Sequence, residues 1–513
     1  MQTNPRLTPL ERILGTFTDI RPGEGLTGVI LFANVFLILC AYYFIKPLRD
    51  SWIAVSNIEG LSSMEVKAYS SFGQSLLLAG VASLFARLST TMPRRTLITR
   101  STLVCMSNLA VFWVLQPGYF IDNLPYAGVV FYLWVGMFGV FIVAQFWAFA
   151  TDLYSDDRGH RLLPLIAIGG TAGAAVGSWL HGWLTGLGSA GAHAVLLLAT
   201  LPLLAAAALS RRAAGFMTPR AGVRRPRHAN FRRVVDDRFV LAAGLLALLL
   251  SWATTNGENL MFHVVQEGVA PATMTPGLDT AAALEHARAA TTAFYGDFYF
   301  WTNLAALAAQ LLVTSRLLKR GGLAAIIFAL PMLALLASAV VALAPALAIL
   351  KWVKVAEQAT DYSLNQTARQ VLWLPASPEV KYESKPTIDA LFVRLGDGLA
   401  ALTVLASSRL AGHSTEVLVV VNVVLVALWL VTAMVVVREH GRLVAARAAE
   451  VHARLVPALR RARRTFAGSI RRLGRSTAAI VRAYLAPGYT VVALLELLPV
   501  GRGHPPPAFA PAA

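Results

Sequence analysis

Charged residues are scarce in this chain of 513 residues: Asp, Glu, Lys and Arg make up 14% of it, whereas hydrophobic residues make up 56%. Soluble domains carry about a quarter charged residues, so this scarcity excludes an ordinary soluble protein. Cysteine is scarcer still, with Cys40 and Cys105 alone, both inside apolar stretches. That number excludes a disulfide framework and a thiol-ligated metal site, and we interpret both as packing residues.

Long apolar stretches, by contrast, are abundant, and the mean hydropathy is +0.60. A helix needs about 20 mostly apolar residues to cross a bilayer. On that length we predict about twelve membrane-spanning helices, at roughly 26–45, 69–90, 96–116, 125–150, 162–185, 191–210, 239–264, 292–315, 321–344, 346–372, 385–411 and 415–438. The polar start of the chain and the length of the first apolar run indicate a retained span rather than a cleavable signal peptide.

Basic residues are distributed unevenly between the connections of these predicted helices. The even-numbered connections contain Arg87, Arg94, Arg95, Arg158, Arg161, Arg316, Lys319 and Arg320, and the central segment 211–238 contains a run of arginines. The odd-numbered connections contain almost none, with Lys67 and Arg288 as the exceptions. Because basic loops stay in the cytoplasm, both chain termini are predicted to be cytoplasmic.

The segment 211–238 also divides the predicted spans six and six. After a cytoplasmic segment 1–25, the sequence predicts an N-terminal half at 26–210, a basic cytoplasmic linker at 211–238, a C-terminal half at 239–438 and a cytoplasmic tail at 439–513. We therefore expect an all-α membrane protein of about twelve transmembrane helices in two six-helix halves, major-facilitator-like. In that arrangement the binding site lies between the halves, near the midplane of the membrane.

The net charge of +18 does not indicate nucleic acid, because the excess lies in the cytoplasmic connections and in the tail. The Arg- and Ala-rich stretch 439–482 is typical of an amphipathic helix on anionic lipid. A further apolar piece, 483–500, is too short to span comfortably. We predict the lipid bilayer as a partner and no obligate protein partner.

Gly169, Gly173 and Gly177 are spaced four residues apart in the fifth predicted span. They lack the preceding strand and the following acidic residue of a dinucleotide-binding loop. Small residues on one helix face instead favour close packing against a second helix. No spacing of residues resembles a metal site, a cofactor site or a catalytic arrangement, so the sequence gives no support for enzymatic activity.

Polar residues follow one side of the predicted helix 346–372. At about 100° per residue, one face contains Lys351, Lys354, Glu357, Gln358, Asp361, Tyr362, Asn365 and Arg369. Trp352 lies on the remaining surface. Charge inside a membrane is costly unless it faces water, a partner or a cargo. The pattern therefore predicts the wall of an aqueous cavity, which is typical of a transporter.

Two further charged clusters favour an anionic cargo. Lys46, Arg49 and Asp50 lie around a proline, and we expect them at the outer end of the first span, facing substrate. Lys385 and Asp389 are four residues apart, and pairing with each other is one interpretation of them. In the other interpretation, cations from both halves converge on the cargo. Glu258 is a further candidate in the seventh span.

Four segments, 42–52, 146–178, 294–322 and 368–402, resemble the ATP/ADP translocase family of bacterial and plastid-type nucleotide exchangers, and the resemblance extends over about residues 25–438. It implies a major-facilitator-like fold, nucleotide exchange and a bacterial inner membrane. By position it implies that Arg49 and Lys385 contact phosphate, while Glu258 falls near an acidic residue of the family. The family's exchangers carry a glutamate at the apparent position of Val135, so a related organic phosphate is an alternative to strict ATP/ADP exchange.

The candidate substrate-binding residues are therefore Lys46, Arg49, Glu258, Lys351, Lys354, Glu357, Asp361 and Lys385, with Glu357 and Asp361 expected to pair with the cations. The aromatic candidates for an adenine base are Tyr42, Tyr43, Phe146 and Trp147. Two alternatives stay open. One is a proton-coupled carrier of another solute that uses Glu258, Glu357 or Asp361 as its titrating group. The other is a transporter-derived scaffold or sensor that acts through its basic tail.

Overall fold

The computed structural model describes residues 8–15, 20–56, 58–92, 94–116, 126–154, 156–216, 236–273, 280–343, 347–377, 380, 384–385, 387–411 and 415–470. The chain divides into two compact units, Met1–Gly441 and Arg442–Ala513. The predicted connection 211–238 and the end of the tail lie mostly outside the described residues. All elements in the described ranges are helical.

The first helices come before the central linker. They are α1 (Pro9–Leu14), α2 (Gly25–Ala54), α3 (Ser63–Thr91), α4 (Arg94–Val114), α5 (Ala127–Leu153), α6 (Asp156–Thr185), α7 (Ser189–Leu198), α8 (Thr200–Ala213) and the short 3-10 helix η1 (Ala214–Phe216). The second set is α10 (Arg238–Thr273), α11 (Thr280–Ala308), η2 (Ala309–Val313), α12 (Thr314–Leu343), α13 (Leu347–Thr360), η3 (Asp361–Asn365), α14 (Gln366–Val371), η4 (Ile388–Phe392), α16 (Val393–Ala411) and α17 (Thr415–Ile470). The elements η2, η3 and η4 are π-helical turns.

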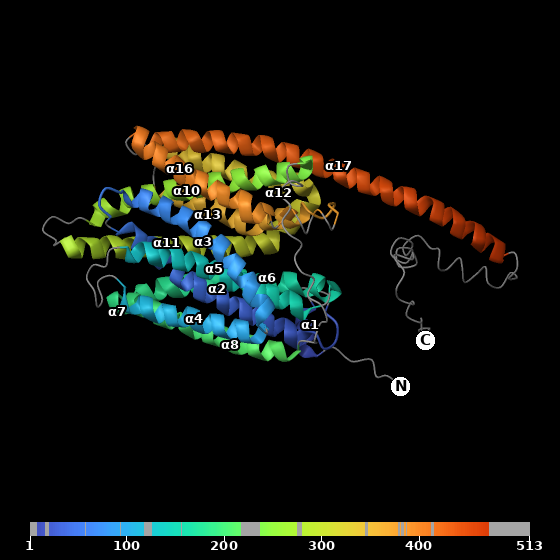
Figure 1. Cartoon of the computed structure of the whole chain (residues 1–513), viewed down its shortest axis with the longest axis horizontal. Coiled ribbons are helices and arrows are strands. Elements are labelled where there is room, and N and C mark those ends of the chain that lie inside the picture. Colours follow the sequence, from blue (N-terminus) through green and yellow to red (C-terminus); the bar gives the residue numbers. More distant parts are fainter. Residues whose placement is uncertain are drawn as a thin grey trace. The chain divides into compact units, whose positions relative to one another are not determined.

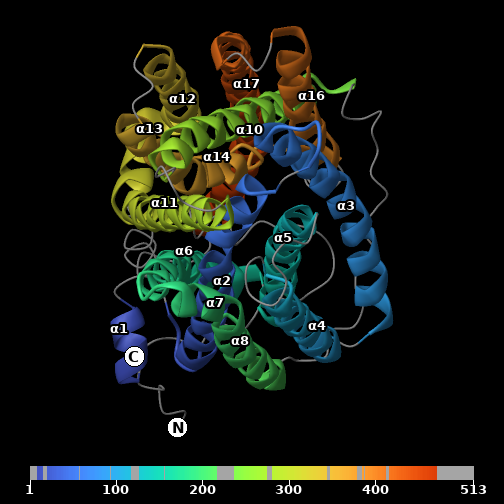
Figure 2. The ribbon, with the colours of Figure 1, turned by 90° about the vertical axis from the view of Figure 1, so that its left-hand side faces the viewer.

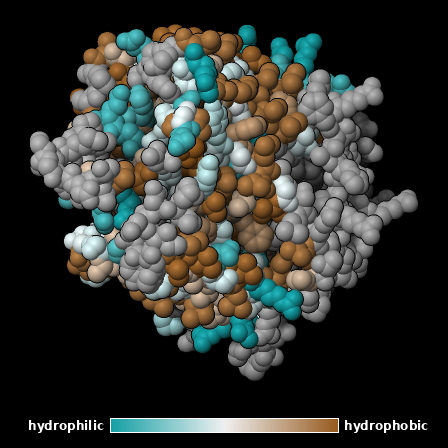
Figure 3. Space-filling model, turned by 60° about the vertical axis from the view of Figure 1, so that its left-hand side comes forward, coloured by the Kyte–Doolittle hydropathy of each residue, from teal (hydrophilic) through white to brown (hydrophobic). Residues whose placement is uncertain are grey.

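Each predicted span coincides with helix. Within the described residues, eight helical stretches are long and apolar enough to cross a membrane, and one of them, Ala283–Leu343, contains two of the predicted spans. Gly322, at φ +63°, separates the eighth and ninth spans within α12. The structure confirms an all-α membrane protein. Apolar side chains cover much of the described surface in Figure 3, as expected of helices that face lipid.

Several predicted ends are wrong. α2 continues to Ala54 instead of ending near residue 45, so Lys46, Arg49 and Asp50 lie buried within the helix rather than at its outer end. α3 begins at Ser63, where Ser62 and Glu65 form a capping box, so Lys67 belongs to a helix and not to a connection. The connection between the predicted spans 239–264 and 292–315 is largely helical where it is described, because α10 and α11 extend into it.

The helices of unit Met1–Gly441 run roughly along one direction (Figure 1) and form two groups when viewed from one end (Figure 2). One group contains α2 and α4–α8, and the other contains α10–α16 and the first part of α17. α3 packs against α5 of the first group and against α16 of the second, and we count it with the first group. We call the end where α8 stops and α10 starts the linker end, and the end where α2 stops and α3 starts the opposite end.

The glycines of α6 bring it into backbone contact with α2. A Cβ atom on Gly169, Gly173 or Gly177 would collide with the carbonyl oxygens of Phe32, Phe36 and Cys40, which lie four residues apart on α2. The backbones therefore approach without intervening side chains, which confirms the predicted packing role of these glycines.

At the linker end, Glu24 joins the start of α2 to the start of α6. Its carboxylate accepts hydrogen bonds from Arg161 Nη1 at 2.8 Å, Arg161 Nη2 at 2.9 Å and Arg158 Nε at 3.1 Å. Burial disfavours the charged form, but the hydrogen bonds from the two guanidinium groups outweigh burial and lower the pKa of Glu24 to about 2. This fork–fork contact fixes both helices at one end.

Because the folded-state pKa of Glu24 lies below the ordinary value of 4.5, its contribution to stability is complete above pH 4.5 and is lost as pH falls towards 2. We expect Glu24→Gln to lower the free energy of unfolding at neutral pH by about 1.5–3 kcal/mol, the value of a charge-assisted hydrogen bond. Melting temperatures of wild type and variant at pH 7, 5 and 3 would test this. An equal difference between the two proteins at all three values would contradict it.

Candidate functional site

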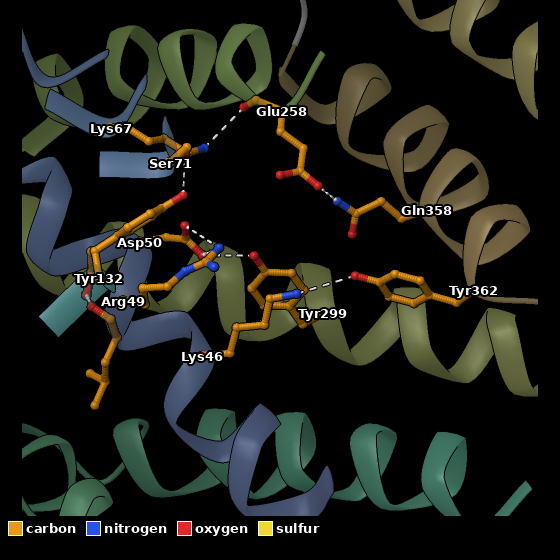
Figure 4. A network of polar contacts seen from close by, with 12 residues as sticks. Lys46, Arg49, Asp50, Lys67, Ser71, Tyr132, Glu258, Tyr299, Gln358 and Tyr362 are labelled. Atoms are coloured by element: carbon orange, nitrogen blue, oxygen red, sulfur yellow. Dashed lines mark hydrogen bonds and ion pairs between the residues drawn. The ribbon is translucent and has the colours of Figure 1, made fainter. Parts of the chain in front are cut away.

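A network of charged and aromatic side chains lies buried where the two groups of helices meet (Figure 4). Its members come from α2, α3 and α5 on one side and from α10, α11, α13 and η3 on the other. The drawn members named in the figure are Lys46, Arg49, Asp50, Lys67, Ser71, Tyr132, Glu258, Tyr299, Gln358 and Tyr362. Residues from before and after the central linker therefore form one polar centre.

Arg49 and Asp50 form its central ion pair. Arg49 Nη2 lies 3.1 Å from Asp50 Oδ1, and the Tyr299 hydroxyl of α11 donates to Asp50 Oδ2 at 2.8 Å. The Arg49 guanidinium also lies 4.6 Å from the centre of the Tyr132 ring. Since Asp50 is 1% exposed, the pair is stabilised by aromatic and hydroxyl groups rather than by bulk water.

Lys46 lies among tyrosine rings of both groups of helices. Its ammonium nitrogen is 4.1 Å from the ring centre of Tyr299 and 4.9 Å from that of Tyr43, and it donates to the Tyr362 hydroxyl at 3.4 Å. No carboxylate of the described residues lies within ion-pair distance of it. The electron-rich ring faces stabilise the cation without neutralising it.

Lys67 of α3 also belongs to the site, although the sequence did not predict it as a site residue. It is 3% exposed, donates to the backbone carbonyl of Glu258 at 3.3 Å and lies 4.4 Å from the centre of the Phe262 ring. Both contacts reach α10, so Lys67 joins the two groups of helices. The signal for its position was the Ser62–Glu65 cap, which starts α3 before Lys67.

The second group of helices adds a lysine and three carboxylates around a small cavity of about 40 Å³. Lys354 pairs with Glu357 at 2.8 Å, which confirms one predicted pairing, and both are buried. The Gln358 amide donates to Glu258 at 3.0 Å. Asp361 instead accepts from the Asn365 amide at 2.6 Å, so the expected pairing of Asp361 with a cation is wrong.

A larger cavity of about 210 Å³ lies towards the linker end and shares Asp361 with the small one. Lys385 lines it, as does the ion pair that Arg369 makes with Asp389 at 2.8 Å. Asp389 thus has Arg369 as an ion-pair partner, which the sequence did not predict. The π-helical turn at η3 inserts one residue between Lys354 and Arg369, which rotates Arg369 relative to the regular helix expected from the sequence.

Not every predicted residue reaches the network. Lys351 forms an ion pair with Asp297 on α11 and lies beside Trp352, half of which is exposed. The residues of the predicted polar face therefore lie in three different environments. Lys351 pairs with Asp297, Lys354 pairs with Glu357 in the network, and Arg369 pairs with Asp389. Of the aromatic candidates, Tyr42 and Tyr43 lie near Lys46, whereas Phe146 lines a separate small cavity of the first group.

The network has four cations and four carboxylates, but they are not paired one to one. Its buried cations are Lys46, Arg49, Lys67 and Lys354, and its carboxylates are the buried Asp50 and Glu357 and the half-buried Glu258 and Asp361. Three buried polar atoms at this centre, Arg49 Nε, Gln358 Oε1 and the Tyr295 hydroxyl, have no hydrogen-bond partner among the described residues. Because buried polar atoms are normally paired, such atoms indicate room for a polar ligand.

Contacts between the two groups of helices lie on both sides of the network. In the first turn of α3, Glu65 accepts from Ser408 of α16 at 2.7 Å. Halfway along, Ser75 donates to Asp397 at 2.9 Å, and Asp397 also accepts from Ser251 at 2.5 Å. The two groups are thus in contact at the opposite end and again on the linker side of the network, where the 210 Å³ cavity lies within the second group.

No protein-family model and no curated protein sequence matches the chain. Solved structures do match its fold. The nucleoside transporter NupG is 14% identical with a TM-score of 0.54 and covers 80% of this chain and 98% of its own. An auto-inhibited POT family peptide transporter is 11% identical, also at 0.54, covering 81% and 97%. The human organic anion transporter MFSD10 (TETRAN) is 14% identical at 0.51, covering 81% and 100%. The chain therefore has a fold of the major-facilitator type.

Proposed function

We propose that this chain is a membrane carrier that moves a nucleotide, or a related organic phosphate, by alternating access between its two groups of helices. The observation that carries the proposal is that two buried lysines at the junction of the two groups, Lys46 and Lys67, have no carboxylate of the described residues within ion-pair distance. The resemblance of its motifs to ATP/ADP translocases and its major-facilitator fold support the same conclusion.

A multiply charged phosphate requires fixed cations in a site of reduced dielectric constant. Arg49 supplies a planar guanidinium group that can bind two phosphate oxygens, whereas Lys46 and Lys67 supply point charges. Lys46 and Lys67 lie within contact distance of aromatic rings and have no carboxylate of the described residues within ion-pair distance. An incoming anion therefore has no bound carboxylate to displace from these two lysines.

The arrangement of contacts supports a path for the cargo. The opposite end is held by Glu65 and Ser408, and Lys385 lines the cavity of the linker end. By the positive-inside rule the linker end faces the cytoplasm. Lys385 therefore lies where it attracts an anion from the cytoplasm towards the network.

One observation favours a proton-coupled carrier as a second candidate. Glu258 accepts a hydrogen bond from the neutral Gln358, and Asp361 accepts one from the neutral Asn365. Neither carboxylate has an ion-pair partner among the described residues. A membrane carboxylate without a cationic partner is the usual position for a proton carrier.

Lys46→Ala should weaken nucleotide binding about ten- to a hundredfold, because one charge-assisted contact is worth about 1.5–3 kcal/mol. Binding of labelled ATP, ADP and organic phosphates to the purified full chain would measure the change. Lys319→Ala is the matched control, since it removes an exposed lysine near the linker end of α12 and should bind as wild type does.

Counterflow in proteoliposomes loaded with the same compounds would separate the two candidates. Uptake of labelled nucleotide that depends on internal nucleotide, with or without a pH gradient, supports exchange. If wild type binds none of the phosphates but an imposed pH gradient drives uptake of another solute, the exchanger proposal is wrong and the proton-coupled carrier replaces it.

A further inference from the structure

A groove of about 650 Å³ lies outside the network, between the two groups of helices near the opposite end. It is lined by α6 and α7 from one group and by α11 from the other, and α2 contributes Leu48 and Trp52 to it. Its volume falls within the range of about 300–1,000 Å³ that is typical of sites for small molecules.

Tryptophans on the outside of the bundle border this groove. Trp179 and Trp183, one turn apart on α6, are 53% and 57% exposed, and Trp301 of α11 is 37% exposed. α6 ends at Thr185, so these indoles lie near its end. Exposed tryptophans near the end of a membrane helix are typical of the zone where lipid headgroups meet acyl chains. The groove therefore opens towards lipid.

Charges of both signs lie along α11 in the same groove. Arg288 is 14% exposed in its side chain and lies 3.3 Å from Glu285, whose side chain is about half exposed. Asp297, also about half exposed, lies further along the groove and pairs with Lys351. Arg288 and Lys67 are the two basic residues that depart from the positive-inside pattern. Lys67 belongs to the network, whereas Arg288 has no part in it.

We propose that this groove binds a zwitterionic phospholipid with a primary ammonium headgroup, of the phosphatidylethanolamine class. The phosphate contacts Arg288, the ammonium group contacts the carboxylates of Glu285 and Asp297, and the acyl chains lie along the exposed indoles of Trp179 and Trp183. A lipid whose headgroup carries only negative charge would meet two carboxylates, Glu285 and Asp297, that already pair with Arg288 and Lys351. The zwitterionic headgroup matches the groove better because it offers a charge of each sign.

The bound lipid contacts both groups of helices, because its site combines α6 and α11. These two helices are also joined directly, by the hydrogen bond from Thr171 to Gln310 and by that from Asn303 to Ser178. A lipid in the groove therefore stabilises the arrangement in which α6 and α11 are close. This inference concerns lipid binding, and it holds whatever solute the network carries.

Native mass spectrometry of the purified full chain, titrated with phosphatidylethanolamine or phosphatidylglycerol of identical acyl chains, would test the proposal. We expect phosphatidylethanolamine to bind about tenfold more tightly. Arg288→Gln should lower its affinity about tenfold through the lost phosphate contact. Ala289→Trp fills the exposed rim of the groove without changing charge and should also lower it.

Arg409→Gln is the matched control, because it removes an exposed arginine near the same end of the bundle on α16. It should bind phosphatidylethanolamine as wild type does. Equal affinity for the two lipids would overturn the proposal. Wild-type affinity in both Arg288→Gln and Ala289→Trp would also overturn it, as would an equal loss in Arg409→Gln.

Discussion

Arg49→Ala is expected to abolish nucleotide binding and exchange, whereas Arg49→Lys should retain a measurable fraction of both. The guanidinium is the planar donor among the network's cations, so its removal loses the bidentate phosphate contact as well as the charge. Lysine restores the charge alone. Affinity for labelled ATP and ADP, measured on purified protein, should therefore decrease in the order wild type, Arg49→Lys, Arg49→Ala.

The same substitution also affects folding. Asp50 is 1% exposed, and with Arg49 removed it keeps Tyr299 as its hydrogen-bond donor but loses its cation. Breaking a buried ion pair typically costs about 3–5 kcal/mol. The double variant Arg49→Gln/Asp50→Asn removes both charges, so it should recover much of the stability of wild type without recovering binding.

That comparison makes the role of Arg49 testable. A double variant that melts close to wild type and still binds no nucleotide supports a phosphate-contacting role. If Arg49→Ala, once shown to be folded by its melting curve, binds nucleotide as tightly as wild type, Arg49 does not contact phosphate.

Hydropathy was sufficient to predict the helices of this protein, because each span must satisfy its backbone hydrogen bonds internally and bury an apolar surface. It failed at the helix ends. The charges of Lys46, Arg49 and Asp50 indicated the membrane boundary, yet α2 continues through them to Ala54. A single sequence does not distinguish a charge at the interface from one that is buried with a partner.

The partners themselves are distant in sequence. Asp50 and Tyr299 are separated by 249 residues, and Lys67 and Glu258 by 191. Composition and periodicity act over one helix, so they identified charged residues but not the pairs they form. For this reason Lys351 was grouped with Lys354, although it pairs with Asp297 on another helix.

The polar face of 351–369 shows a second limit. A regular helix places Lys354, Asp361 and Arg369 on one side. The π-helical turn Asp361–Asn365 rotates the residues that follow it about the helix axis, so Arg369 reaches Asp389 instead of the network. No residue type in that segment marks the turn, whereas the glycine spacing of α6 predicted its packing directly.

Gly173→Leu combined with Gly177→Leu is expected to prevent the chain from folding, because both side chains would enter the backbone of α2. Even Gly173→Ala should lower the melting temperature, since its Cβ would collide with the carbonyl of Phe36, a backbone group that cannot rotate away. Overpacking typically costs about 1–3 kcal/mol. Helix propensity alone predicts a higher melting temperature for Gly173→Ala, because alanine is favoured over glycine in a helix by about 1 kcal/mol.

Gly182 provides the matched control on the same helix, since a Cβ atom there meets nothing within 4 Å. Gly182→Ala should leave the melting temperature unchanged or raise it slightly, as propensity predicts. Thermal unfolding of Gly173→Ala and Gly182→Ala in detergent would distinguish the effect of the backbone contact with α2 from the effect of helix propensity. If Gly173→Ala raised the melting temperature as Gly182→Ala does, α2 and α6 would not be in backbone contact. Because α2 carries Lys46, Arg49 and Asp50, that contact also sets the position of the cations against which the tyrosines of α11 and η3 pack.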